Sequence, residues 1–88
     1  MVAGAADLSE ANLSDAFLRR CNLKGANLRN ADLSGANLRN ANLRWADLKK
    51  ADLSNADLRK ANVYGARVQA DGISTLSEIR AFGAVVEK

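Results

Sequence analysis

A five-residue phrase repeats without interruption from Ala6 to Ala70, and its odd period leaves few folds open to the chain. In each phrase the first residue is small, the second is usually polar, and the third is a branched apolar residue that we call the centre. The fourth and fifth residues vary, and we call them the first and second outer positions. The small position is Ala except at Cys21. The centres are Leu8, Leu13, Leu18, Leu23, Leu28, Leu33, Leu38, Leu43, Leu48, Leu53, Leu58, Val63 and Val68.

This period excludes the two regular structures as continuous elements. An α-helix turns by about 100° per residue, so centres five apart would step by about 140° and spiral around its surface. A continuous strand has a side-chain period of two, so successive centres would point to opposite faces. The chain must therefore change direction every five residues. Within each short side the small and centre positions then point inward, and the polar position points outward.

The outer positions indicate how many sides a coil has. First outer residues match at a spacing of twenty, whereas a spacing of fifteen mixes residue types. Twenty residues per coil means four sides, with about three coils stacked at the strand spacing of roughly 4.8 Å. The sequence therefore predicts an all-β, four-sided solenoid. Two matching columns are Ser14, Ser34, Ser54 and Ser74, and then Arg19, Arg39 and Arg59.

The phrase resembles the repeat of the pentapeptide-repeat family, which is commonly written A(D/N)LXX. Thirteen consecutive copies cover about three quarters of the chain, so the resemblance is specific. It implies the right-handed quadrilateral β-helix of that family, with the centre and small residues inside. The handedness is an implication of the resemblance and does not follow from the spacing.

The chain divides into three parts. Residues 1–5 form a short lead, residues 6–70 the β-helix, and residues 71–88 a C-terminal cap. The segment from Thr75 to Glu78 fits a capping box, and Leu76, Ile79 and Phe82 follow at helical spacing before Gly83. We expect a short capping α-helix that lays this apolar face over the open end of the stack.

Self-association is the alternative role for this terminus. Some members of the family that the chain resembles dimerise through their C-terminal ends. The same apolar residues would serve that contact, and Val85 and Val86 would extend the surface. The resemblance therefore implies a homodimer as one option.

Length and charge set broad limits on the function. A chain of 88 residues forms one small domain, and a net charge of +3 permits an anionic partner without requiring one. One cysteine, Cys21, cannot form an internal disulfide, and a small inward residue is what its position needs. No stretch approaches the roughly 18 apolar residues of a membrane span. We predict a soluble, cytoplasmic protein without a membrane partner.

Trp45, the single tryptophan, is the first candidate for a partner contact. Its neighbours at a spacing of twenty are Gly25 and Gly65, which leave room for the ring along the wall. Arg44 and Tyr64 lie beside it in the adjoining column. These three residue types are favoured in interaction hot spots, although packing between coils would also explain the ring.

Two further outer features have a structural and a functional interpretation. The column Arg19, Arg39 and Arg59 is either a solvated face or a binding face for an anion or an acidic protein. Phe17 occupies an outward, polar position, where it is either shielded by the N-terminal residues or contacts a partner. The ladder of Asn22, Asn42 and Asn62 is expected to be structural, with amides that bond to each other or to the turns.

The residue patterns that mark most catalytic sites are not found in the sequence. The chain has no His, which excludes His-based triads, and one Cys cannot make a cysteine zinc site. The carboxylates follow the repeat and do not converge, and a solenoid filled by leucine leaves no substrate cavity. We expect no enzyme activity, no metal and no cofactor.

The sequence therefore favours a non-catalytic scaffold or protein-interaction module. The resemblance supplies one alternative, because some members of the family mimic duplex DNA and inhibit type II topoisomerases. That mimicry needs an acidic surface, and the outer positions here are largely basic, which disfavours it. In the other alternative, the positive charge of the basic columns would bind nucleic acid or another polyanion.

Overall fold

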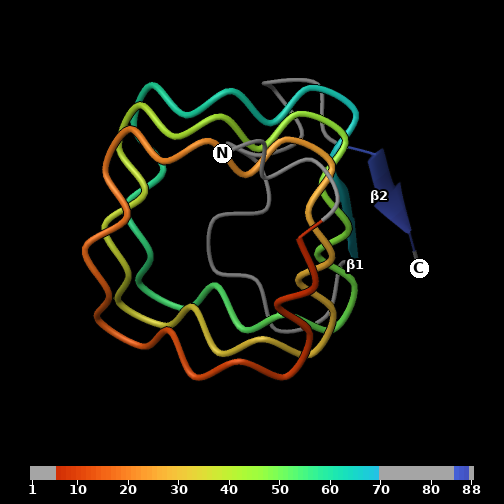
Figure 1. The fold of residues 1–88 in the computed structure, drawn as a ribbon, viewed down its shortest axis with the longest axis horizontal. Coiled ribbons are helices and arrows are strands. Elements are labelled where there is room, and N and C mark those ends of the chain that lie inside the picture. The colour runs from red at the N-terminus through yellow and green to blue at the C-terminus, as the bar shows by residue number, and fades with distance from the viewer. Residues whose placement is uncertain (1–5, 70–84, 88) are drawn as a thin grey trace.

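A four-sided coil is the whole architecture of the described part of the chain, which comprises residues 6–69 and 85–87 of a computed structural model (Figure 1). Across those residues nine isolated parallel bridges join the coils, and every one of them pairs residues twenty apart. The first joins Asp7 to Asn27 and the last joins Asp47 to Arg67. The predicted coil of four five-residue sides is confirmed.

The bridges also define which residues share a side. Side 1 contains residues 6–10, 26–30, 46–50 and 66–69, and side 2 contains residues 11–15, 31–35 and 51–55. Side 3 contains residues 16–20, 36–40 and 56–60, and side 4 contains residues 21–25, 41–45 and 61–65. The first and second outer positions of each phrase form the corner that leads to the next side.

Each corner is a tight turn closed by one backbone hydrogen bond. The N–H of the next small residue donates to the C=O of the centre, as from Ala11 to Leu8 at 3.1 Å. The second outer residue lies in the left-handed region in these turns, with φ of 62° at Glu10 and 70° at Gly25. A β-turn whose third residue has a positive φ favours Gly or Asn at that place.

The polar position stabilises the same corner from outside. The Oδ1 atom of Asn42 accepts the backbone N–H of Arg44 at 3.2 Å, and Asn22 and Asn62 do the same for Lys24 and Tyr64. The amides of the predicted ladder thus bond to the turns. This is why Asp or Asn, whose short side chains reach the backbone two residues on, recurs at the second place of the phrase.

Hydrogen bonds between coils have a fixed direction. The N–H of the polar residue donates to the preceding coil, as from Asn27 to the C=O of Ala6 at 2.9 Å. The N–H of the centre donates to the following coil, as from Leu8 to the C=O of Asn27 at 2.8 Å. The N–H and C=O groups of every polar residue therefore face the coil before it.

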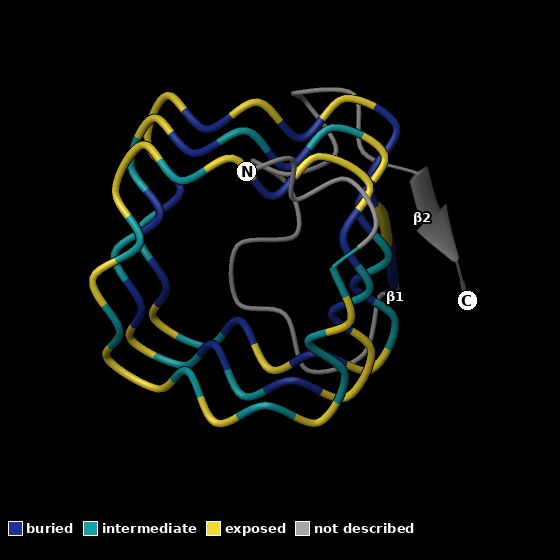
Figure 2. Ribbon diagram, in the orientation of Figure 1, coloured by how far each residue is buried: buried dark blue, intermediate teal, exposed yellow. Residues whose placement is uncertain are grey.

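The core is a stack of centres and small residues along the axis of the coil (Figure 2). Leu28, Leu33, Leu38 and Leu43 have no exposed surface, which confirms the inward assignment. Burial is incomplete in the first coil, since no residue between positions 6 and 22 is fully buried. Its inward residues pack against the core while remaining partly exposed, and they are Ala6, Leu8, Leu13, Leu18 and Cys21.

The C-terminal segment adds one strand to the stack. Strand β1, Arg67–Gln69, pairs in parallel with strand β2, Val85–Glu87, so that Arg67 lies opposite Val85 and Gln69 opposite Glu87. Strand β2 thus lies along side 1, but its partners are eighteen residues apart, whereas successive coils pair residues twenty apart. The expected helix through Leu76, Ile79 and Phe82, like the 70/71 boundary, lies outside the described residues. The self-association proposed for Val85 and Val86 stays a prediction.

Candidate functional site

An aromatic pair on side 4 is the most distinctive surface feature of the described residues. The rings of Trp45 and Tyr64 lie edge to face, with centroids 5.4 Å apart and planes at 85°. The two residues are 52% and 55% exposed, respectively. Such a pair is itself stabilising, and its remaining surface is open to solvent. Two of the three predicted hot-spot residues are therefore brought together.

Glycine 65 makes room for the indole. A Cβ atom built on Gly65 would collide with the six-membered ring of Trp45, so the ring lies directly against this glycine. Gly65 is buried and has a left-handed φ of 73°. The predicted wall packing of Trp45 is thus present on the Gly65 side, and it holds the ring in one position while leaving half of it exposed.

Trp45 is a bulky residue in a left-handed corner position. Its φ is 62°, a left-handed value that is rare for bulky residues because Cβ approaches the backbone closely. The same corner carries glycine in the coils before and after it, at Gly25 and Gly65. The second outer residues of other corners share this value, such as Lys50 at 62° and Lys60 at 61°, so it is a requirement of the corner and Trp45 is a candidate for its exposed ring alone.

Arg44 adds a polar group beside the aromatic pair. Its Nε atom is buried and has no hydrogen-bond partner. A buried donor without an acceptor carries a desolvation cost. Because this atom has no surface, a partner carboxylate would have to pair with the Nη groups of the guanidinium. We call Arg44, Trp45 and Tyr64 the side 4 patch.

The arginine column on side 3 is partly neutralised by its own carboxylate. Arg59 donates to both oxygens of Asp57, from Nε to Oδ1 at 3.0 Å and from Nη2 to Oδ2 at 2.8 Å. These hydrogen bonds, helped by the backbone N–H of Arg59, lower the pKa of Asp57 to about 2. Arg19 and Arg39 share the side with this pair, as predicted. The column is therefore less cationic than its sequence indicates.

Phe17 is an exposed residue, and the predicted cover by residues 1–5 lies outside the described residues. Its outward position on an exposed strand edge leaves it 76% exposed. A shallow depression of about 380 Å³ lies beside it, lined by Phe17, Arg19 and Arg20. Phe17 lies on side 3, next to side 4, but it belongs to the first coil, whereas Trp45 and Tyr64 belong to the second and third coils.

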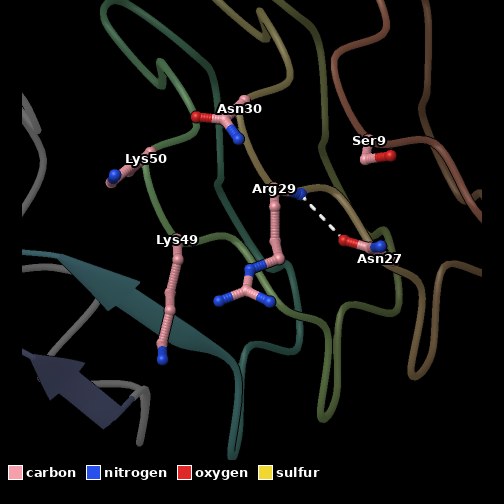
Figure 3. Close-up of a pocket in the computed structure, with 6 residues that line it drawn as sticks. All are labelled: Ser9, Asn27, Arg29, Asn30, Lys49 and Lys50. Carbon is pink, nitrogen blue, oxygen red and sulfur yellow. Dashed lines mark hydrogen bonds between the residues drawn. The ribbon is translucent and has the colours of Figure 1, made fainter.

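A basic depression on side 1 was missed by the sequence interpretation. It has a volume of about 460 Å³ and is shown in Figure 3, where the side chains of Arg29 and Lys49 extend in the same direction. Arg29 also contacts Asp47, with Nε 3.3 Å from Oδ2. The sequence could have indicated this depression, because Arg29 and Lys49 are twenty residues apart in the same first outer column. The lining residues are Ser9, Asn27, Arg29, Asn30, Lys49 and Lys50.

Metal-binding geometry is missing from the part of the chain that the structure describes. Within residues 6–69 and 85–87, no group of three or more His, Cys, Asp or Glu side chains could hold a metal ion. The same described residues include no helix that could cross a membrane.

Comparison with known proteins gives the family. The model for pentapeptide repeats matches residues 5–40 and 36–69, with eight copies. The chain therefore belongs to the pentapeptide-repeat family, whose members form right-handed β-helices and are generally non-catalytic. No curated protein sequence matches the chain at a significant level.

Three solved structures illustrate the similarity. The chain is 51% identical to the pentapeptide repeat protein Rfr23 from the cyanobacterium Cyanothece 51142, over 62% of this chain and 37% of that one, with a TM-score of 0.62. It is 40% identical to HetL from Nostoc sp. PCC 7120, over 77% and 30%, with a TM-score of 0.56. HetL is described as involved in the regulation of heterocyst differentiation.

The third similar structure is close to the chain in size. It is the pentapeptide repeat protein alr5209 from Nostoc PCC 7120, at 28% identity and a TM-score of 0.56, and the match covers 97% of this chain and 88% of that one. The chain thus spans about a third of Rfr23 and HetL but most of alr5209.

Proposed function

We propose that this protein is a non-catalytic interaction module that binds a protein partner through the side 4 patch. The observation that carries the proposal is the exposed edge-to-face pair of Trp45 and Tyr64. Half-exposed aromatic residues on a rigid wall offer apolar area at little cost in side-chain entropy. A cytoplasmic location is proposed with it, on the argument from the lone cysteine.

The patch also predicts the chemistry of the partner. Arg44 provides a cationic guanidinium, and the rings provide an apolar surface beside it. The complementary partner segment presents a carboxylate next to an apolar side chain. The regulatory role described for HetL is compatible with such a module, because regulation by a solenoid without catalytic groups requires a binding partner.

Affinity capture with matched baits tests this function. The unaltered protein and an Arg39→Gln control are expected to retain the same partner, and Arg44→Gln and Tyr64→Ser baits to lose it. A hot-spot residue of this kind changes affinity by on the order of thirtyfold. With the captured partner purified, the emission of Trp45, the single tryptophan, should shift on binding. Equal capture by all four baits would contradict the proposal.

Polyanion binding is a second candidate, favoured by the depression on side 1. Arg29, Lys49 and Lys50 line it, and the arginines of side 3 add to the basic surface. Binding to phosphates should weaken steeply with salt because condensed counterions are released. Titration of labelled duplex DNA at two salt concentrations tests this, with Lys49→Gln and Lys50→Gln as the variants that should weaken binding. Affinity that is absent at low salt would exclude it.

We do not propose inhibition of a type II topoisomerase by DNA mimicry. Arg and Lys are the commonest charged residues at the outer positions of the repeats, where Glu10 and Asp15 are the only acids, and a mimic of duplex DNA needs regularly spaced negative charge in their place. Potent inhibition in a gyrase supercoiling assay would overturn this judgement.

A further inference from the structure

The first coil ends in an open edge with a partly exposed core. Leu8, Leu13 and Leu18 are only partly buried, whereas the equivalent Leu28, Leu33 and Leu38 one coil later have no exposed surface. The difference arises because each coil is covered by its neighbours, and the described residues supply no coil before the first. An apolar end of this kind favours association with another surface.

The backbone at this end is ready for strand pairing. The N–H and C=O groups of each polar residue face the preceding coil, as Asn27 shows by its bonds to Ala6 and Leu8. The corresponding groups of Asp7, Asn12, Phe17 and Asn22 have no hydrogen-bond partner among the described residues. They form one unpaired edge segment on each of the four sides, and unpaired edges are templates for pairing with another chain.

Charge is divided into two halves around this end. The corner after side 1 carries Glu10 and the corner after side 2 carries Asp15. The corner after side 3 carries Arg19 and Arg20, and the corner after side 4 carries Lys24. A line that bisects sides 1 and 3 therefore separates the two acidic corners from the two basic ones. All five side chains belong to exposed residues.

We propose that two copies of the protein associate head to head through these N-terminal ends, around a two-fold axis that bisects sides 1 and 3. A two-fold axis in this plane places each acidic corner over a basic corner of the other copy. Glu10 then faces the partner's Lys24, and Asp15 faces the partner's Arg19 and Arg20. The interface is isologous and self-complementary, as a closed dimer requires.

The same axis places the aromatic residue of this end at the interface. Side 3 of one copy lies over side 3 of the other in antiparallel orientation, so that Phe17 meets the partner's Phe17. The contact would bury Phe17, which is the most exposed of the large apolar residues in the described part of the chain. On sides 2 and 4, Asn12 lies opposite the partner's Asn22, where the open backbone groups can pair.

Two features oppose the contact and limit its strength. Asp7 lies on the axis at side 1 and faces the partner's Asp7, although Ser9 and Asn27 bind its Oδ1 atom at 2.6 and 3.4 Å. The carboxylate of Asp15 rests against Gly35 of the next coil, so it acts on the partner through its field without direct contact. Salt should therefore weaken the dimer.

The opposite end of the coil is less open to this association. Strand β2 already pairs with β1 there and occupies the edge of side 1. The N-terminal end is also separate from the side 4 patch, whose aromatic residues belong to later coils. Dimerisation and partner binding can consequently fail or succeed independently of each other.

Charge reversal with rescue tests the proposed dimer. One variant carries Glu10→Lys and Asp15→Lys, and the other carries Arg19→Glu, Arg20→Glu and Lys24→Glu. Each is expected to weaken self-association by on the order of tenfold or more, because like charges then meet at the corners. An equimolar mixture should form a heterodimer, as measured by sedimentation velocity. The control is Lys50→Glu with Lys60→Glu, which changes charge at corners of the third coil.

The variants are compatible with the fold. Lys already occupies the second outer position at Lys50 and Lys60, with φ of 62° and 61°, and Glu occupies it at Glu10. Equal unfolding midpoints by circular dichroism confirm that only the end has changed. A fourth variant, Phe17→Ser, should weaken the dimer without altering the net charge.

Each outcome of this experiment either supports or overturns the proposed dimer. A dimer that weakens with salt, is lost in each reversed variant and returns on mixing supports the proposal. An unaltered protein that is monomeric at all concentrations overturns it. So does a mixture that remains monomeric, or a dimer that persists in both reversed variants, which would place the contact elsewhere on the molecule.

Discussion

Trp45 shows how one residue can conflict with the local geometry of its repeat and still be accommodated. The corner position requires a left-handed backbone, which Gly and Asn adopt easily and a bulky aromatic residue does not. Gly65, twenty residues later, removes the side chain that would otherwise occupy the place of the ring. The conflict is thus resolved by a residue in the next coil and gives the surface a rigid aromatic group.

Replacing Gly65 by Ala should disturb both the backbone and the ring. The new Cβ would strain a left-handed residue and displace the indole, so we expect a loss of about 1 to 3 kcal/mol in the free energy of unfolding. The emission of Trp45 should also change. Gly25→Ala is the matched control, because Gly25 has a similar φ of 70° on the other side of Trp45. An unchanged emission spectrum in Gly65→Ala would contradict the contact.

The low pKa of Asp57 predicts that its contribution to folding stability depends on pH. Hydrogen bonds from the side chain and the backbone N–H of Arg59 hold the pKa of Asp57 at about 2, below the ordinary value of 3.8. Because the pKa is depressed on folding, its contribution to stability is present above about pH 4 and is lost as the pH falls toward about 2. A carboxyl titration by NMR should show the low pKa and a rise in Arg59→Gln. The same midpoint in both proteins would refute this cause.

At the scale of the elements, each side of the coil owes its stability to the sides above and below it. A five-residue side forms one corner bond of its own, and its remaining backbone bonds go to other coils. The apolar centres are likewise covered by the neighbouring coils. This dependence on nearest neighbours is typical of solenoids.

The position of a centre in the stack should therefore decide how much its loss costs. Leu38→Ala removes a side chain without exposed surface and is expected to lower the free energy of unfolding by about 2 to 5 kcal/mol. Leu13→Ala, at the partly exposed end, should cost less than half as much, since part of that side chain is already in water. Urea denaturation of both variants measures the difference, and equal losses would count against the end being open.

Strand β2 should protect β1 from solvent. Removal of residues 85–88 exposes the edge of Arg67–Gln69, which is paired in the intact chain. We expect faster amide exchange in β1 and a lower unfolding midpoint, with little change in the second coil. Glu87→Pro serves as a second variant, because Arg67 uses its N–H and C=O on the preceding coil and the donor that faces β1 in this register is then the N–H of residue 87. Unaltered exchange in both variants would mean that the pairing adds no stability.

The whole molecule is predicted to unfold from its first coil. In the charge-reversed, monomeric variants the amides of Leu8, Leu13 and Leu18 should exchange faster than those of Leu28 and Leu33, because only one neighbouring coil covers them. Exchange measured by NMR at several pH values tests this. In the unaltered protein, association through the same end should reduce the difference. Uniform protection throughout a monomeric variant would argue against the open end.

Most of the fold could be predicted from the sequence, because each repeat specifies its own structure. The inward Leu38, the corner at Asn40 and the outward Asn42 follow from a five-residue phrase with a twenty-residue match. The strand β2 could not be predicted in this way. It lies beyond the last repeat, and its partner β1 is chosen by the open edge of side 1, which a local pattern does not reveal.

The side 4 patch was only partly predictable. The spacing of twenty places Trp45 between two glycines and beside Tyr64, which gives the neighbours but not the orientation. The same spacing could have revealed the depression at Arg29 and Lys49. That Arg59 is paired with Asp57 while the Nε of Arg44 has no partner depends on side-chain torsions, which the repeat does not specify.

The five-residue phrase by itself determined a four-sided coil with a leucine core, because its odd period permits no continuous helix or strand and its outer residues match at twenty. The tertiary structure alone decided which surfaces are open. Exposure depends on what lies above and below each residue, so equivalent leucines are fully buried in the second coil and only partly buried in the first. The side chains of Phe17, Trp45 and Tyr64 acquire their roles from those neighbours, which identical repeats cannot encode.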